Sequence, residues 1–145
     1  MLIVSACLLG IDCRYDASHR LSLVLREKAQ REGHIPVCPE QLGGLPTPRQ
    51  SVSIQGGNGF DVLDRKCRIC DQEGNDLTEQ LIRGAFETLK IAKLLGIRKA
   101  ILKERSPSCG VQFTTSRQEL IQGPGVTAAL FLREGIEVIS DESCK

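Results

Sequence analysis

Short apolar segments alternate with helical patterns along this chain, and that alternation constrains the fold more than any other feature. The apolar segments are rich in Ile and Val and too short for helices, so they are predicted to be buried strands. These segments are 3–7, 34–38, 99–103 and 136–139. Between them, apolar residues recur at the three- and four-residue spacing of amphipathic helices. The predicted helices are 21–32, 76–95 and 126–133.

Strands that alternate with helices favour a parallel sheet, because right-handed crossovers place the helices on both of its faces. We therefore expect an α/β fold, a three-layer sandwich with a mostly parallel four-stranded sheet that is flavodoxin-like or Rossmann-like. The stretch 55–75 is expected to form a small hairpin excursion, and 41–48 and 104–118 are expected to be loops. The length of 145 residues predicts a single cysteine-rich domain, 1–145.

The balance of basic and acidic residues limits the kinds of binding partner that we expect. Lys and Arg number 19 and Asp and Glu number 18, so the chain lacks the basic character of a nucleic-acid-binding protein. The N-terminal residues show no charged leader, and no apolar run approaches the roughly 18 residues of a membrane span. We expect a cytoplasmic protein with a small-molecule partner, no nucleic acid and no membrane, and the sequence leaves its oligomeric state open.

Cysteine is unusually frequent for such a protein. There are seven cysteines, an odd number and too few for a disulfide scaffold. They are Cys7, Cys13, Cys38, Cys67, Cys70, Cys109 and Cys144. In a reducing compartment, a dense set of thiols indicates metal binding or thiolate chemistry more often than disulfide bonds.

Three of these thiols are predicted to converge. Cys7 and Cys38 end the first two predicted strands, and Cys109 lies in the loop after the third. The carboxyl ends of parallel strands meet at one edge of the sheet, where ligands bind. Thiolates suit zinc, copper(I) and iron-sulfur clusters, and three of them leave one coordination position open. Cys13 is a fourth ligand or a nucleophile, with Arg14 beside it; the alternative for each thiol is simple burial in the core.

Three longer blocks carry a family resemblance. They are 5–16 (SACLLGIDCRYD), 37–49 (VCPEQLGGLPTPR) and 103–110 (KERSPSCG), with 123–130 (GPGVTAAL) and 135–136 towards the end. These blocks resemble the signature of the thiouracil desulfurase family, a bacterial family long catalogued as a domain of unknown function. The resemblance covers nearly the whole chain. One departure is Ala17, which stands where the family usually has Gly, so the turn there is expected to differ.

The resemblance implies a specific chemistry. It implies removal of sulfur from a small thiolated heterocycle such as 2-thiouracil, without net redox change, by a 4Fe-4S cluster that only three cysteines hold. Carried over to this sequence, the ligands are Cys7, Cys38 and Cys109, and the free iron binds the substrate sulfur. The alternative is a non-enzymatic module or sensor that uses the same thiols to bind a metal or a cluster.

A desulfurase also needs a base to activate water. Glu40, two residues after Cys38, is predicted to be the general base, with Asp16 and Glu104 as alternatives. Ser106 is predicted to donate a hydrogen bond to the substrate or cluster, as is its neighbour at position 108. An enzyme requires Glu40 to face an open metal position, whereas a binding module closes that position with a fourth protein ligand.

The remaining motifs are expected to be incidental. Cys67 and Cys70 form a single CxxC pair, which without a second pair is weak evidence for zinc, and their role stays open. Cys144 is expected to be an exposed thiol at the frayed C-terminus. The glycines at 56–59 lack the Lys-Ser/Thr of a phosphate-binding loop and are expected to form a turn.

Overall fold

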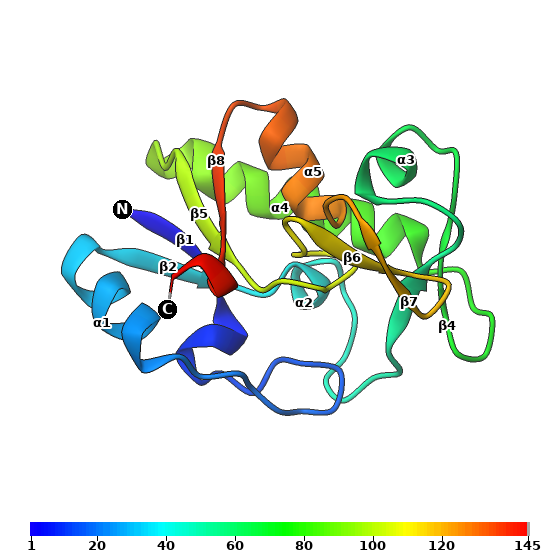
Figure 1. The fold of residues 1–145 in the computed structure, drawn as a ribbon, viewed down its shortest axis with the longest axis horizontal. Coiled ribbons are helices and arrows are strands. Elements are labelled where there is room, and N and C mark those ends of the chain that lie inside the picture. The colour runs from blue at the N-terminus through cyan, green and yellow to red at the C-terminus, as the bar shows by residue number, and fades with distance from the viewer. Residues whose placement is uncertain (145) are drawn as a thin grey trace.

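Four parallel strands form the sheet that organises the molecule (Figure 1). The computed structural model describes residues 1–144. The strands are β1 (Leu2–Ser5), β2 (His34–Val37), β5 (Lys99–Leu102) and β8 (Glu137–Ser140), in the order β2-β1-β5-β8. Every pairing within this sheet is parallel, as the alternation of strands and helices predicts.

Helices cover both faces of this sheet and complete the predicted three-layer sandwich (Figure 1). They are α1 (Leu23–Glu32) on one face and α4 (Thr78–Leu95) with α5 (Val126–Arg133) on the other. Successive residues of a strand point to opposite faces. Accordingly Leu2 and Val4 belong to the apolar cluster that contains α1, while Ile3 belongs to the larger cluster that contains α4 and α5.

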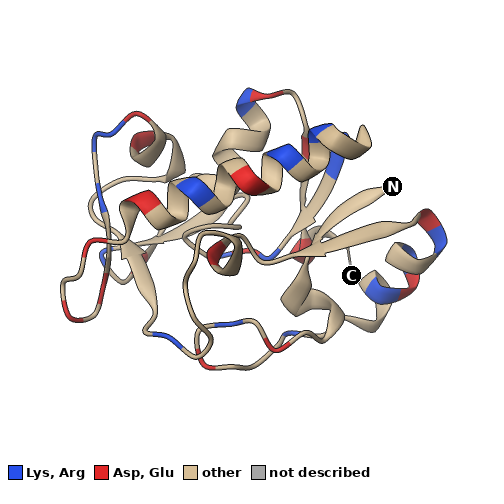
Figure 2. Cartoon of the chain, turned by 180° about the vertical axis from the view of Figure 1, so that it is seen from behind, with Lys and Arg blue, Asp and Glu red and all other residues tan. Residues whose placement is uncertain are grey.

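Local hydrogen bonds and a glycine set the ends of the two longest helices, α1 and α4. Ser22 caps α1, because its side chain accepts the backbone N–H of Leu25. At the start of α4, the Asp76 carboxylate accepts the backbone N–H of Thr78, and Gly96 ends the helix in the left-handed conformation. Charged residues are spread along α4 (Figure 2). Among residues 1–144, no helix is both long and apolar enough to cross a membrane.

A second sheet stands beside the first and was not predicted. It contains β3 (Val52–Ile54), β4 (Ile69–Asp71), β6 (Phe113–Ser116) and β7 (Glu119–Gln122), in the order β4-β3-β6-β7. The prediction that residues 104–118 form a loop is therefore wrong for residues 113–116, which belong to β6. The turn between β6 and β7 is formed by Arg117 and Gln118, both at positive φ, and neither residue gives the Asn-Gly signal of a tight hairpin.

Two short helices also differ from the sequence expectation. Residues 61–63, predicted within a hairpin excursion, belong to α3 (Gly59–Leu63), because Asn58 and Asp61 form a capping box that starts a helix. The expected loop 41–48 begins inside α2 (Pro39–Leu42), whose N-cap is Cys38. The antiparallel pairing of β3 with β4 is what remains of the predicted excursion.

The first strand is shorter than predicted. It ends at Ser5, and the chain continues into a 3₁₀ helix, η1 (Ala6–Leu9), which Gly10 ends with φ +93°. Further on, Ala17 adopts φ +59°, the left-handed conformation that glycine favours. The turn at this position thus keeps a glycine-like backbone in spite of the alanine.

Helix α2 packs directly on α4 through glycines. A Cβ atom on Gly84 of α4 would overlap the carbonyl oxygen of Pro39, and one on Gly43 would overlap the carbonyl oxygen of Gln80. The two backbones therefore touch, and this contact fixes where α2 and its flanking residues lie.

Replacement of Gly84 by Ala is expected to destabilise the protein by about 1–3 kcal/mol, because the methyl group pushes α2 away from α4. Helix propensity alone predicts the opposite sign, a gain of about 1 kcal/mol. Urea denaturation measures the difference. Arg83→Ala, on the exposed side of the same helix, is the control and should change stability by less than about 0.5 kcal/mol. A stabilised Gly84→Ala variant would contradict the contact.

Candidate functional site

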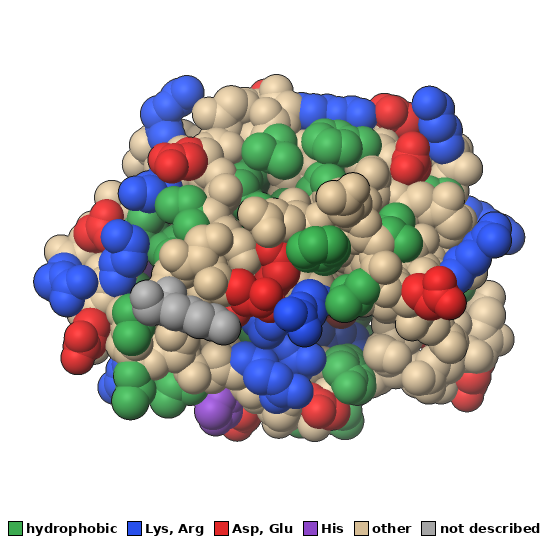
Figure 3. Space-filling view, viewed as in Figure 1, with side chains coloured by type: hydrophobic (Ala, Val, Ile, Leu, Met, Phe, Trp, Pro, Cys, Tyr) green, Lys and Arg blue, Asp and Glu red, His purple; other side chains and the backbone are tan. Residues whose placement is uncertain are grey.

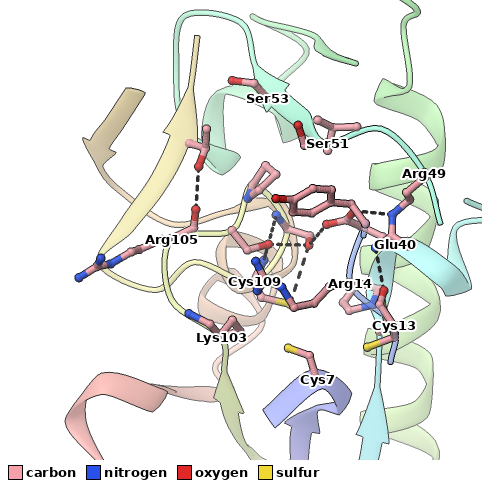
Figure 4. A pocket seen from close by; sticks show the side chains of 18 of the residues that line it. Cys7, Cys13, Arg14, Glu40, Arg49, Ser51, Ser53, Lys103, Arg105 and Cys109 are labelled. Carbon is pink, nitrogen blue, oxygen red and sulfur yellow. Dashed lines mark hydrogen bonds and ion pairs between the residues drawn. The ribbon is translucent and has the colours of Figure 1, made fainter. Parts of the chain in front are cut away.

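A pocket of about 420 Å³ lies between the carboxyl edge of the parallel sheet and the second sheet (Figure 4). One wall comes from the residues that follow β1, β2 and β5, and the other comes from β3, β4 and β6. Five of the seven cysteines line it: Cys7, Cys13, Cys38, Cys70 and Cys109. A volume of this size falls within the range of small-molecule sites.

The three thiols predicted to converge reach the pocket from three strands. Cys7 lies in η1, just after β1, rather than at the strand end as predicted. Cys38 directly follows β2 and begins α2. Cys109 lies in the loop after β5, where its backbone N–H donates to Ser106 Oγ at 3.2 Å. The parallel sheet thus brings together residues that are far apart in the sequence.

Cys13 lies between Cys7 and Cys38. Hydrogen bonding with the Cys13 thiol lowers the pKa of Cys7 and lowers the pKa of Cys38 to about 7. The same two contacts, together with burial, raise the pKa of Cys13. Arg14 contributes to the lowered pKa of Cys7 through its positive charge. Cys13 therefore favours the charged forms of Cys7 and Cys38.

Cys109 is chemically different from the other two. It is buried, and this burial raises the pKa of its thiol, with a hydrogen bond from Ser5 opposing the effect. The Ser108 hydroxyl also lies 3.9 Å from the Cys109 sulfur. A bound cation would be needed to hold a thiolate in such surroundings.

Glu40 projects from α2 into the pocket and uses both carboxylate oxygens (Figure 4). Arg49 Nε donates to Glu40 Oε1 at 3.0 Å, and Ser108 Oγ donates to Oε2 at 2.9 Å. Ser106 Oγ lies 3.0 Å from Ser108 Oγ and accepts the backbone N–H groups of Ser108 and Cys109. Because Ser108 gives its only proton to Glu40, Ser106 must donate to Ser108, so the chain of hydroxyls points at the carboxylate.

The two alternative bases lie elsewhere. Neither Asp16 nor Glu104 is among the residues that line the pocket. Asp16 is exposed and accepts hydrogen bonds from Ser18. Glu104 is buried, and its Oε1 accepts the backbone N–H groups of Val111, Gln112 and Phe113 at 2.6, 2.9 and 3.0 Å. Glu104 therefore shapes the loop that carries a pocket thiol.

The structure separates the remaining cysteines. Cys70 lines the pocket from β4, a position that the sequence did not predict, whereas its partner Cys67 does not line it. Cys144 is half-buried against the apolar cluster of α1 and is not the exposed thiol predicted. Sequence reasoning missed Cys70 because nothing local shows that β4 faces the carboxyl edge of another sheet.

Positive charge surrounds the thiols. The basic residues that line the pocket are Arg14, Arg49, Lys103 and Arg105. Figure 3 shows basic side chains gathered near the centre of one face, next to acidic ones. Arg105 is paired with Glu142, and Arg49 with Glu40, whereas the buried Nε of Arg14 has no acceptor among residues 1–144. The pocket is thus suited to an anionic, electron-rich group.

Known proteins are similar to this chain in sequence and in fold. A model of the family described as 2-thiouracil desulfurase matches residues 2–143. The chain belongs to the 2-thiouracil desulfurase family. Among relatives of this family, the uncharacterized protein YbbK of Bacillus subtilis (strain 168) is 44% identical over 144 residues, which cover 97% of this chain and 95% of YbbK.

A solved structure of the desulfurase family supports the fold. It is described as the [4Fe-4S]-dependent thiouracil desulfidase TudS and superposes with a TM-score of 0.85 at 37% identity, covering 98% of this chain and 91% of that chain. The α/β architecture predicted from the alternation of strands and helices, and the family resemblance, are both confirmed.

The residues present fit a 4Fe-4S cluster in kind and in charge. Within 1–144, no group of three His, Cys, Asp or Glu side chains is placed to hold a single metal ion. Several thiols line one pocket, and thiolates are the ligands that iron-sulfur clusters take. The unpaired Nε of Arg14 offers a donor to a negatively charged, sulfur-rich group.

The lowered pKa of Cys38 predicts its reactivity in the cluster-free protein. Since alkylation requires the thiolate, the reaction of Cys38 with iodoacetamide should be half-maximal near pH 7, against about pH 8.5 for an ordinary thiol. Mass spectrometry of peptides over a pH series measures it. Cys144 serves as the internal control, because burial raises its pKa and delays its reaction to higher pH. An ordinary pH profile for the alkylation of Cys38 would contradict its hydrogen bonding with Cys13.

Proposed function

We propose that this protein removes the sulfur of a small thiolated heterocycle such as 2-thiouracil by hydrolysis, with a 4Fe-4S cluster as cofactor. The reaction converts C=S and H₂O into C=O and H₂S, so it needs no electron donor or acceptor. The observation that carries this proposal is the pocket in which several thiols lie beside the ion-paired carboxylate of Glu40. Membership of the desulfurase family and the likeness to TudS support it.

The proposed ligands of the cluster are Cys7, Cys38 and Cys109. Each follows a different parallel strand and lines the pocket. Cys13 is proposed to stay outside the ligand set, because it shares the segment after β1 with Cys7, whereas the three proposed ligands follow three different strands. When bound, the cluster would supply an iron without a cysteine ligand, which binds the soft thiocarbonyl sulfur and makes the adjacent carbon electrophilic.

Glu40 is proposed to take the proton of the attacking water. Its two oxygens are held by Arg49 and Ser108, which leaves further lone pairs free to accept that proton. Ser106 and Ser108 form the hydroxyl chain that ends on Glu40, so a proton arriving there can be shared with Ser108 once its hydroxyl turns. In this proposal Ser106 orients Ser108 and Cys109, and its hydroxyl does not contact the attacking water.

Serine variants of the cysteines test the ligand set. Reconstitution of Cys7→Ser, Cys38→Ser or Cys109→Ser with iron and sulfide under anaerobic conditions is expected to yield no stable cluster, because each variant removes a thiolate ligand. Iron and sulfide analysis and the visible spectrum measure the outcome. Cys67→Ser, outside the pocket, is the control and should bind a full cluster.

Cys13→Ser distinguishes the enzyme from a binding module. In the proposed enzyme this variant keeps the cluster, since Cys13 is not one of the three proposed ligands. Loss of the cluster in Cys13→Ser would instead identify a fourth protein ligand. The coordination would then be closed, and the protein would be a metal-binding module or sensor.

Glu40→Gln tests the proposed base. The amide preserves the shape of the side chain but does not accept the proton of water, so kcat for sulfide release from 2-thiouracil should fall by about 10² to 10⁴ while the cluster spectrum stays unchanged. Glu119→Gln, on exposed β7, is the control and should match the unmodified protein. Normal turnover by Glu40→Gln would remove Glu40 from the mechanism. If the cluster-loaded protein releases no sulfide from any thiolated pyrimidine, the proposed activity is wrong.

A further inference from the structure

Arg49 is a buried arginine whose guanidinium lies beside the proposed base. The side chains of Arg49 and Glu40 are only 7% and 12% exposed. Most ion pairs of residues 1–144 lie on the surface, and the one between Arg133 and Asp64, for example, has side chains that are 42% and 41% exposed. An ion pair buried to this degree must be held by further hydrogen bonds, because its desolvation is expensive.

Those hydrogen bonds connect three segments of the chain. Besides Glu40 Oε1, the Arg49 guanidinium binds Pro46 O at 3.1 Å, Thr47 Oγ1 at 2.9 Å and Cys13 O at 3.0 Å. The backbone N–H of Arg49 donates to Tyr15 O at 2.7 Å. The loop 11–16, helix α2 and the loop 43–51 therefore meet at one side chain.

This arrangement uses nearly all of the donors that Arg49 has. A guanidinium carries five N–H donors, and the four acceptors already described take up all but one. Arg49 has little capacity left to bind a substrate directly. Its effect on a reaction in this pocket must pass through the groups that it holds, and Glu40 is the one of these with a side chain that can accept a proton.

We propose that Arg49 is a positioning residue for Glu40, and this inference rests on the proposed role of Glu40 as base. A free glutamate side chain samples many rotamers, and fixing it in one orientation costs conformational entropy. Arg49 on Oε1 and Ser108 on Oε2 together hold one orientation of the carboxylate over the thiols. Lys cannot replace this function fully, because a single ammonium does not reach four acceptors in a plane.

The test compares Arg49→Met with the cluster-loaded protein, using 2-thiouracil as substrate. A base displaced by about 1 Å loses about 10²-fold in rate, so kcat should fall by about that factor. KM should change less than about threefold, because Arg49 does not contact the substrate, and the visible spectrum of the cluster should stay the same. Arg49→Lys should restore part of kcat. Arg133→Met, which removes an exposed ion pair, is the matched control and should leave kcat and KM unchanged.

A double-mutant cycle decides whether Arg49 acts through Glu40. If it does, Glu40→Gln and the double variant Glu40→Gln/Arg49→Met should have the same kcat within about twofold. If the effects of the two changes on kcat multiply, or if kcat is unchanged in Arg49→Met, the inference about Arg49 is overturned. If Arg49→Met does not retain its cluster, Arg49→Lys takes its place in the cycle with the same two outcomes. Loss of the cluster in both variants would show a purely structural role for Arg49 and would overturn the inference. Normal turnover in Glu40→Gln alone would instead refute the proposed base.

Discussion

The parallel pairing of β1 with both β2 and β5 is the constraint on which the rest of the site depends. Ser5 pairs with Val37 at the ends of β1 and β2, and the Ser5 hydroxyl accepts the backbone N–H of Lys103 where the chain leaves β5. Three chain segments therefore leave the sheet at one edge and in fixed register. Each of them carries one of the three proposed ligands, so the sheet sets the relative positions of these thiols before any cofactor binds.

The two sheets contribute to the pocket in different ways. The parallel sheet supplies most of the reactive groups, including the three proposed ligands and Glu40. The second sheet supplies the opposite wall, which is largely polar and uncharged, with Ser51, Ser53 and Thr115 among its residues. Backbone contact between α2 and α4 and the hydrogen bonds of Arg49 then fix α2 between these parts.

Sequence periodicity was sufficient for the parallel sheet, because its strands and helices are long enough to show their patterns. It was insufficient for the second sheet, whose strands β3 and β4 have three residues each and whose β6–β7 turn uses Arg117 and Gln118. The grouping of Cys7, Cys38 and Cys109 followed from topology alone. The contacts of Glu40 with Arg49 and Ser108 depend on loop conformation, and the position of Cys70 depends on how the two sheets meet; neither has a local signal.

The buried carboxylate of Glu104 gives the site a sensitivity to acid that does not involve the reaction itself. Burial opposes its charge, but hydrogen bonds from Ser140 and from the backbone of 111–113 outweigh that effect and lower the pKa of Glu104 below the ordinary value of a glutamate. Its stabilising contribution is therefore complete above the pKa of the unfolded chain and is lost as the pH falls through the lower folded value. Protonation would release the turn at 111–113 and loosen the loop that carries Cys109. Acid would thus disturb the arrangement of the proposed ligands through Glu104, a residue that does not contact the substrate.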